Sequence, residues 1–492
     1  MTMMMMMMMS LWNFDNAGTT FYNVIVVPAL LLIVFPFVFI VAILLPVVWY
    51  WNVGRVPRTT QTQVHAFFHP YCSGGGGGER VLWKIVQSLQ SDQDGPKKVI
   101  IFTVDPPGTD ERKVREEAQR RFDVQITHPV ELVSLEDCRH YLNPRPFLSL
   151  VMESWGTMQL ANEALRRYAE SHKETPIDVY WDTTGCAFTF LVARWMSPSS
   201  WILAYVHYPT ISTDMMAWEW QQSAGRRPLH KTMAKMLYYW FFAIIYGMVG
   251  SLADLVMVNS TWTFGHIKRL WGLVNSGRIH IVYPPCRVPP VAEQEEASGR
   301  SRTIVSIGQF RPEKDHTLQI KSLARLFEIY PQHKQESVQL LLIGSCRNEQ
   351  DQSRVDALKK LVVEHQLQPF VKFSINPPYK ELQESMDSAL IGIHTMRQEH
   401  FGIGIVEMMA AGLIVVAHDS GGPKTDIVQH KVTGFLATSK DEYAEALHEA
   451  LTLPAQQTRI LREQARESAT RFSDQVFDQR LPAVLSKLMR NT

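Results

Sequence analysis

The chain has 492 residues, enough for about two or three domains of ordinary size. Apolar residues make up 46% and charged residues 20%, which excludes wholesale disorder. The net charge of +1 excludes a nucleic-acid binder that neutralises phosphates along a groove. The five cysteines are scattered and form no Cys-x-x-Cys pair, so we expect no disulfide framework, no zinc site and a reducing compartment.

An apolar segment near the start of the chain is the first strong signal. No charged side chain occurs between Asn16 and Gly54, and Val24–Val48 is almost entirely apolar and long enough to cross a bilayer as a helix. We therefore expect a transmembrane anchor over residues 24–50, preceded by a lumenal tail over residues 1–23. A cleaved signal peptide is the alternative, but the segment is too long and lacks a preceding basic region and a following cleavage site.

The charges that flank this segment predict its orientation. Arg55 and Arg58 follow it, whereas only Asp15 precedes it. The positive-inside rule therefore places everything after residue 54 in the cytosol.

Two further stretches are apolar. Residues 236–250 follow four basic side chains and are rich in aromatic residues, so they fit a membrane-associated helix over residues 233–250 or an ordinary buried helix. Residues 401–417 are expected to form a buried helix followed by a buried strand.

Past residue 60, short apolar runs alternate with longer helical stretches, which predicts an α/β fold with parallel sheets covered on both faces. The expected strands cover residues 64–68, 99–104, 178–181, 202–206, 255–258 and 279–283, and then residues 303–307, 338–343, 371–374, 389–394 and 414–417. We expect two Rossmann-like domains, residues 60–285 and 300–475, joined by a proline-rich charged linker and followed by a C-terminal helix over residues 476–492. Facing domains of this kind form a cleft at their strand ends, where ligands bind.

A glycine-rich loop follows the first expected strand. Five consecutive glycines, Gly74–Gly78, leave the backbone free of side chains, so a phosphate can approach its amides and the N-terminus of the next helix. The spacing is not that of a Walker A loop, and a flexible linker is the alternative. His207 ends another strand and is expected to project into the cleft, either as a functional residue or as a structural histidine.

The second half carries a denser set of motifs. Arg311 and Lys314 lie in the loop after its first strand, a suitable place to clamp a diphosphate. Glu399 and Glu407, with seven residues between them, bracket a glycine turn and the start of a helix. That spacing lets one carboxylate bind sugar hydroxyls and the other a ribose diol. The Gly421-Gly422 turn follows and is expected to lead into a helix.

The one Asp-x-Asp sequence comprises Asp92 and Asp94. It precedes Gly95-Pro96 in a polar stretch, so it is interpreted as a turn and not as a metal site. We expect no metal and no cofactor.

Together, these motifs resemble the GT-B retaining glycosyltransferases, which include bacterial lipid mannosyltransferases, glycogen synthases and sucrose synthases. More narrowly, the chain is similar over about residues 64–475 to the family of eukaryotic dolichol-pathway α-1,2-mannosyltransferases, through blocks such as FFHPYCSGGGGGERVLW, YVHYPTISTDM, SIGQFRPEKDH and HTMRQEHFGIGIVEMMAAG. The resemblance implies transfer of mannose from GDP-mannose to dolichol-diphosphate-linked Man3GlcNAc2, adding the fourth and fifth mannoses with retention. It also implies a single-pass protein of the endoplasmic reticulum membrane with cytosolic catalytic domains.

The resemblance implies a role in the cleft for each candidate residue. Lys314 and Arg311 would hold the donor diphosphate, Glu407 the ribose, and His207 would lie beside the reacting carbon. Glu399 would bind the mannose, together with the backbone of Phe401, Gly402, Ile403 and Gly404. The glycine-rich loop would approach the donor phosphate or the acceptor through Gly76, Gly77 and Gly78. The chain departs from the broader superfamily at Gln309, where a basic residue is usual, and at His394-Thr395, which replaces Pro-Ser.

A front-face displacement, in which the departing diphosphate takes the acceptor proton, is favoured over a covalent intermediate, because no unpaired carboxylate in these motifs suits the reactive face.

Expected partners are GDP-mannose, the dolichol-linked oligosaccharide, the membrane and other early mannosyltransferases of the pathway, but no nucleic acid. The sequence also argues against two other functional classes. The anchor argues against a soluble polymer synthase, and Glu399, Glu407 and Lys314 argue against an inactive glycan-binding subunit.

Overall fold

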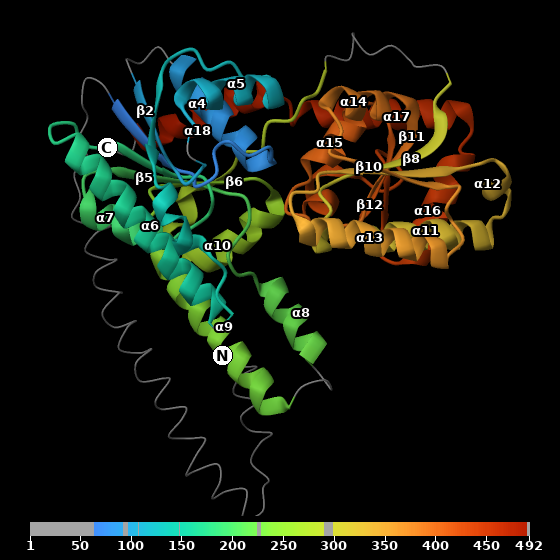
Figure 1. Cartoon of the computed structure of the whole chain (residues 1–492), viewed down its shortest axis with the longest axis horizontal. Coiled ribbons are helices and arrows are strands. Elements are labelled where there is room, and N and C mark those ends of the chain that lie inside the picture. Colours follow the sequence, from blue (N-terminus) through green and yellow to red (C-terminus); the bar gives the residue numbers. More distant parts are fainter. Residues whose placement is uncertain are drawn as a thin grey trace, which may run out of the picture.

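The computed structural model describes residues 63–91, 97–106, 108–146, 148–223, 228–289 and 299–489. The expected anchor at residues 24–50, its lumenal tail and the Asp92–Asp94 turn lie outside the described residues. Two α/β units lie side by side, one from each half of the chain (Figure 1).

The first unit is built on a parallel seven-stranded sheet of order β3-β2-β1-β4-β5-β6-β7. Its strands are β1 (Gln63–Phe68), β2 (Lys97–Thr103), β3 (Val130–Ser134), β4 (Val179–Asp182), β5 (Trp201–Val206), β6 (Leu255–Val258) and β7 (Ile279–Ile281). Its helices are α4 (Gly77–Ser91), α5 (Glu111–Phe122), η2 (Glu136–Leu142), α6 (Ser149–Ser171), α7 (Thr189–Met196), α8 (Thr213–Ser223), α9 (Leu229–Gly250), α10 (Thr261–Asn275) and η3 (Ser276–Arg278).

The second unit is built on a parallel six-stranded sheet of order β10-β9-β8-β11-β12-β13. Its strands are β8 (Ser301–Ile307), β9 (Gln339–Gly344), β10 (Val371–Ile375), β11 (Ala389–His394), β12 (Ile414–His418) and β13 (Phe435–Ala437). The helices are η5 (Pro312–Lys314), α11 (His316–Ile329), α12 (Gln332–Gln335), α13 (Glu349–Glu364), α14 (Tyr379–Ser388), α15 (Ile403–Ala410), η6 (Pro423–Ile427), α16 (Lys440–Thr452), α17 (Ala455–Thr470) and α18 (Asp474–Met489).

All eleven expected strands are present, with ends that differ by at most two residues. The sequence missed β3 and β13, which are both sheet edges. A strand at an edge buries less of its surface, so β3 carries a weaker apolar signal, and β13 has only three residues. The helix-then-strand interpretation of residues 401–417 is confirmed by α15 and β12. The turn at Gly421-Gly422 leads into the five-residue π-helical turn η6 instead of a regular helix.

Continuous apolar strands place each sheet between two layers of helices. In the first sheet, alternate side chains of one strand enter the two cores on opposite faces, so that Phe68 lies in one and Phe67 in the other. Phe67 stacks on Trp181 of β4 with 5.2 Å between ring centroids. Burial of each such side chain contributes about 1.5–3 kcal/mol relative to exposure, so the sheets are rigid supports for the loops at their ends.

The last helix, α18, returns to the first unit, where it lies beside α4 (Figure 1). Phe477, Leu481 and Val484 on α18 belong to the core of that unit. Arg80 on α4 contacts Asp474 at 3.0 Å. The C-terminal helix therefore ties the end of the second unit to the first.

The order of strands reverses direction between β1 and β4 in the first sheet and between β8 and β11 in the second. Parallel α/β sheets bind ligands outside the carboxyl ends of the strands at such switch points. The glycine-rich loop follows β1, the loop with Lys314 follows β8, and the loop with Glu399 follows β11. Three of the expected motifs therefore lie at the two positions where this fold forms its ligand site.

Candidate functional site

The glycine-rich loop brings the start of α4 against the second unit. The Gly76 amide donates to Oε2 of Glu79 at 2.8 Å, which fixes the loop on the first turn of α4. A Cβ atom added to Gly77 would lie 2.6 Å from Cδ1 of Ile403, and one added to Gly78 would lie 3.5 Å from Nε2 of His207. The loop thus packs between a residue at the start of α15 and the expected histidine. Two helix N-termini, which favour anions, meet at this point.

His207 follows β5 and is fixed through its backbone, because Nδ2 of Asn259 donates to its carbonyl oxygen at 2.8 Å. Its Nε2 atom is buried and has no hydrogen-bond partner among the described residues. Burial, followed by the nearby His69 and His400, lowers the pKa of His207 to about 3. The ring is therefore neutral at physiological pH, with one nitrogen left for a ligand.

Lys314 and Glu399 form the strongest charged contact of the second unit's switch point. Nζ of Lys314 lies 2.5 Å from Oε2 of Glu399, and Nε2 of His394 lies 3.2 Å from the same oxygen. Burial alone would raise the pKa of Glu399, but the charge of Lys314 and the hydrogen bond from His394 outweigh it and hold the pKa well below its usual range. Glu399 is therefore a carboxylate at any physiological pH.

The pair His394-Thr395, which departs from the superfamily pattern, holds this arrangement together. Oγ1 of Thr395 donates to the carbonyl oxygen of Lys314 at 2.8 Å and accepts from Gln319 at 2.9 Å. The Tyr443 hydroxyl donates to the carbonyl oxygen of His394 at 2.9 Å. Sequence reasoning noted the departure but assigned no role to either residue. The available signal was the position of His394 at a strand end, the same as that of His207.

The Gly421-Gly422 turn lies directly beneath the Glu399 loop. The Gly422 amide donates to the Glu399 carbonyl oxygen at 2.7 Å, and a Cβ on Gly422 would lie 2.6 Å from the backbone of His400 and Phe401. Only glycine allows this approach. The Phe401 side chain is buried in the core, which leaves only its backbone for contact with a ligand.

The side chains of Glu407 and Arg311 make fewer and weaker contacts than that of Lys314. Glu407 is partly buried on α15 and has no hydrogen-bond or ion-pair partner among the residues that the structure describes. Burial raises its pKa, against the opposing charges of Arg80 and Arg287. Arg311 makes only a long contact of 3.7 Å to Glu313. Both side chains can therefore bind a ligand without breaking a strong contact.

Asp426, in the segment expected to form a helix after the Gly421-Gly422 turn, joins the two units, and sequence reasoning assigned it no role. Its carboxylate accepts from the backbone amide of Thr261, the first residue of α10, at 3.1 and 3.0 Å, and from the Tyr283 hydroxyl at 2.9 Å. A residue of the second unit thus caps a helix of the first, which fixes the two walls of the cleft relative to each other.

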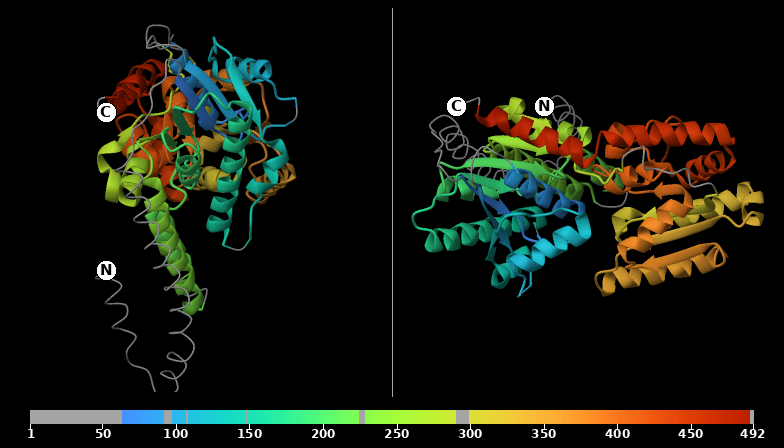
Figure 2. Two further views of the ribbon diagram at one scale, coloured as in Figure 1. Left: turned by 90° about the vertical axis from the view of Figure 1, so that its left-hand side faces the viewer. Right: turned by 90° about the horizontal axis from the view of Figure 1, so that it is seen from above.

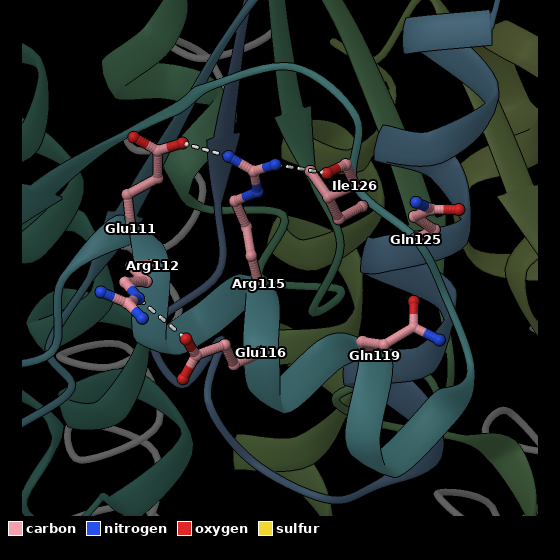
Figure 3. Close-up of a pocket in the computed structure, with 7 residues that line it drawn as sticks. All are labelled: Glu111, Arg112, Arg115, Glu116, Gln119, Gln125 and Ile126. Carbon is pink, nitrogen blue, oxygen red and sulfur yellow. Dashed lines mark hydrogen bonds and ion pairs between the residues drawn. The ribbon is translucent and has the colours of Figure 1, made fainter.

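A hollow is lined by residues of α5 and of the loop that follows it (Figure 3). Its charged side chains already pair with one another: Arg115 contacts Glu111 at 3.1 Å and Arg112 contacts Glu116 at 2.9 Å. Since these charges are satisfied and exposed, the hollow offers nothing specific to a ligand.

The helix expected at residues 233–250 is α9, which is partly buried and partly exposed. Its C-terminal half contributes Phe242, Tyr246 and Val249 to the core, whereas Met233 and Trp240 are exposed. Within the described residues, one helix, His230–Gly250, is long and apolar enough to cross a membrane, with 33% of its most apolar window buried. α8 and α9 project from the first unit (Figure 1, Figure 2).

Further exposed apolar side chains lie on α8 and at the start of α6. They are Met152, Trp155, Met215, Trp218 and Trp220. Nζ of Lys235 on α9 lies 2.7 Å from Oε1 of Glu219 on α8, and this ion pair joins the two helices. We call the exposed apolar side chains of α6, α8 and α9 the apolar surface.

Two family models match the chain. Residues 62–271 match the family described as ALG11 mannosyltransferase N-terminus, and residues 290–471 match glycosyl transferases group 1. A human protein named GDP-Man:Man(3)GlcNAc(2)-PP-Dol alpha-1,2-mannosyltransferase is 42% identical over 87% of this chain and 87% of its own length. Proteins of the same name from Xenopus laevis and Dictyostelium discoideum are 43% and 37% identical, over 85% and 87% of this chain and 86% and 85% of their own lengths.

The fold is also that of solved glycosyltransferase structures. Sucrose-phosphate synthase from Thermosynechococcus elongatus matches 87% of this chain and 100% of its own, with a TM-score of 0.62 and 18% identity. Anabaena Alr3699/HepE in complex with UDP matches 86% of this chain and 100% of its own, with a TM-score of 0.57 and 17% identity. At this identity the likeness concerns the fold alone, which is the two-domain GT-B arrangement expected from the sequence.

Proposed function

Because this chain belongs to the family of GDP-Man:Man(3)GlcNAc(2)-PP-Dol alpha-1,2-mannosyltransferases, we propose that it transfers mannose from GDP-mannose to a 2-hydroxyl of dolichol-diphosphate-linked Man3GlcNAc2. It is a glycosyltransferase, and the proposal adds that it places the fourth and fifth mannoses. The observation that carries the proposal is the partly buried Lys314–Glu399 pair at the carboxyl ends of β8 and β11, together with a glycine-rich loop that packs against His207 and the start of α15.

Each charged residue of the cleft has a proposed part in binding the donor. Lys314 and Arg311 neutralise the diphosphate, together with the amides at the N-termini of α4 and α15. Glu399 accepts hydrogen bonds from the mannose hydroxyls, and the unpartnered carboxylate of Glu407 accepts them from the ribose. The neutral imidazole of His207 contacts the sugar beside the reacting carbon.

The same contacts favour retention by front-face displacement. A carboxylate that is ion-paired at 2.5 Å and stabilised in its charged form is a poor nucleophile, so Glu399 is unsuited to a covalent intermediate. The bond from the anomeric carbon to the diphosphate breaks while the acceptor oxygen approaches from the same face. The acceptor proton passes to the departing diphosphate oxygen, and Lys314 and Arg311 stabilise the charge that develops there.

The test of the activity uses the full chain in detergent, a synthetic lipid-diphosphate-linked Man3GlcNAc2, and a panel of labelled nucleotide sugars. We expect transfer from GDP-mannose, products one and two mannoses larger, and their digestion by an α-1,2-specific mannosidase. The Glu399→Gln variant is the matched negative control. Transfer from a UDP-sugar in preference to GDP-mannose, or resistance of the product to the mannosidase, would overturn the proposal.

We propose that the protein spans the endoplasmic reticulum membrane once and that its catalytic units lie in the cytosol. There they meet GDP-mannose and other early enzymes of the pathway. The apolar surface supports contact with the membrane, because exposed tryptophans favour the bilayer interface. Asn259, in the only Asn-x-Ser/Thr sequence, is buried, so the absence of a glycan on it would say nothing about topology. An acceptor sequence inserted near Gln294 should stay unmodified, and its glycosylation would place the units in the lumen.

A further inference from the structure

Four aromatic side chains form a continuous row across the boundary of the two units. The rings of Tyr208 and His400 stack with 5.2 Å between centroids and 24° between planes. The ring centroid of Trp262 lies 5.3 Å from that of His400, and the centroid of His266 lies 4.3 Å from that of Trp262. Tyr208, Trp262 and His266 come from the first unit and His400 from the second. We call these four residues the aromatic row.

The row begins at the candidate reaction centre. Tyr208 follows His207, and His400 follows Glu399, so two of its rings are attached to residues that face the donor. Tyr208 keeps 52% of its surface exposed, and its hydroxyl has no hydrogen-bond partner within the described part of the chain. A large aromatic side chain left open beside a cleft is more typical of a binding site than of a core.

The other end of the row reaches the apolar surface. Nε2 of His266 lies 3.2 Å from a carboxylate oxygen of Asp214, and its Nδ1 lies 3.3 Å from the Thr213 hydroxyl. Both residues belong to the first turn of α8, whose later residues include the exposed Trp218 and Trp220. The row therefore connects the reaction centre with the helices that carry exposed apolar side chains.

The chemistry of the row fits sugars. The C–H faces of pyranose rings pack on flat aromatic faces, while their hydroxyls need polar partners at the ring edges. Tyr208, His400 and Asp214 supply such partners along the row. An acceptor that carries a lipid at one end and a reactive hydroxyl at the other needs a surface of this kind between the membrane and the donor.

We propose that the aromatic row is the binding site for the acceptor glycan. The sugar that receives mannose packs on Tyr208, and the sugars nearer the lipid pass Trp262 toward α8. The proposal rests on the proposed function, and it assigns glycan recognition to residues that are separate from the donor contacts of Lys314, Glu399 and Glu407.

The experiment compares Tyr208→Ala and Trp262→Ala with wild type in the full-length protein. We expect the KM for the lipid-linked acceptor to rise about tenfold or more, while the KM for GDP-mannose changes by less than about twofold. Tyr208→Phe retains the aromatic face and should lose less than Tyr208→Ala. Trp195→Ala is the matched control, because Trp195 is 78% exposed at the end of α7 that points away from the strand ends.

Free Man3GlcNAc2 without its lipid provides a second measurement. It should inhibit the wild type in competition with the lipid-linked acceptor, and this inhibition should weaken in Tyr208→Ala. An unchanged acceptor KM in both alanine variants, or an equal rise in the KM for GDP-mannose, would overturn the assignment. If Trp262→Ala does not fold, the two Tyr208 variants decide. Wild-type protein that transfers no mannose would instead refute the proposed function.

Discussion

Lys314 and Glu399 are 85 residues apart in the chain, and their charged atoms lie 2.5 Å apart at the switch point of the second sheet. The sheet itself brings them together, because β8 and β11 are hydrogen-bonded neighbours and their carboxyl ends meet at one edge. Taking these charges out of water is costly, and their mutual attraction and the contact with His394 offset that cost. Such a pair is better explained by its use in a site than by a gain in stability.

The first prediction concerns Lys314→Met. The substitution leaves the Glu399 carboxylate buried with His394 as its remaining partner, so its pKa should rise. We expect a loss of at least about 100-fold in kcat/KM, the usual effect of removing a group that stabilises developing charge. Because Lys314 keeps 23% of its side chain exposed, the expected loss of stability is about 1–3 kcal/mol. Steady-state kinetics and urea unfolding measure the two effects.

The double variant Lys314→Met/Glu399→Gln is its control. Removing both charges should cost less stability than the sum of the two single changes, since no unpaired buried carboxylate remains. Additive losses of stability would show that the pair does not act as a unit in the folded protein.

The second prediction concerns Glu407→Gln. Glu407 has no partner within the described residues and burial disfavours its charged form, so the change should not lower the unfolding midpoint. Loss of one charged hydrogen bond to the donor should lower kcat/KM for GDP-mannose about tenfold or more. Glu384→Gln, an exposed change on α14, is the matched control. An unaltered kcat/KM in Glu407→Gln would remove this residue from the donor site.

The third prediction tests the contact between the glycine-rich loop and α15. The added methyl of Gly77→Ala would lie 2.6 Å from Cδ1 of Ile403, so either the Ile403 side chain turns away or the two helix N-termini move apart. A displacement below 1 Å at this point should lower kcat/KM on the order of tenfold. Ile403→Val removes the carbon that is in the way, so the double variant should recover most of the activity.

Gly277→Ala serves as the control for this pair, because a Cβ at Gly277 would meet nothing within 4 Å. An equal loss of activity in Gly77→Ala and in the double variant would mean that the flexibility of Gly77, and not its contact with Ile403, matters for the reaction.

The strands, and the loops at their carboxyl ends that carry the candidate site, were predictable from the sequence for a simple physical reason. Strands of a parallel sheet are buried on both faces, so they appear as continuous apolar runs, and polar residues at their carboxyl ends share one edge. The loops that hold His207, Lys314 and Glu399 could therefore be placed before any coordinates were known. β3 was missed because only the first of its five residues is fully buried, and β13 because it has only three residues.

Contacts between distant segments could not be predicted in the same way. Asp426 caps Thr261 from 165 residues away, and no periodicity or motif encodes that pairing. The return of α18 to the first unit could not be predicted either, because the apolar face of a helix can pack on any buried surface. His394 was visible as a departure from the superfamily pattern, but its contact with Glu399 follows from the path of the loop after β11.

The fourth prediction concerns divalent metals. If Lys314 and Arg311 supply the positive charge at the diphosphate, mannose transfer should persist in excess EDTA with less than about a twofold change in rate. The measurement compares initial rates with and without chelator at saturating GDP-mannose. Complete loss of activity that manganese restores would contradict the turn assigned to Asp92 and Asp94.

The fifth prediction is a dependence of stability on pH. Burial lowers the pKa of His69 to about 4 and that of His207 to about 3, whereas both titrate near about 6.5 when unfolded. Between those limits the unfolded state binds more protons, so the stability of the first unit should fall as pH falls from about 6.5 toward 4. Each histidine contributes a slope of up to about 1.4 kcal/mol per pH unit. Stability should be fully present above pH 7.

Tryptophan fluorescence can follow this effect without a contribution from the second unit, because no tryptophan occurs after Trp271 in the sequence. Urea midpoints should drop between pH 7 and pH 5, and His69→Gln should reduce the drop because glutamine takes up no proton. Nδ1 of His69 contacts the Thr183 hydroxyl at 2.7 Å, so the variant will be less stable at pH 7 and the comparison must use the difference between the two pH values. His128→Gln, at an exposed position, should keep the full drop. A histidine that is buried in its neutral form must contribute to the drop of the urea midpoint. If His69→Gln keeps the full drop, His69 is not its source and the acid sensitivity arises elsewhere.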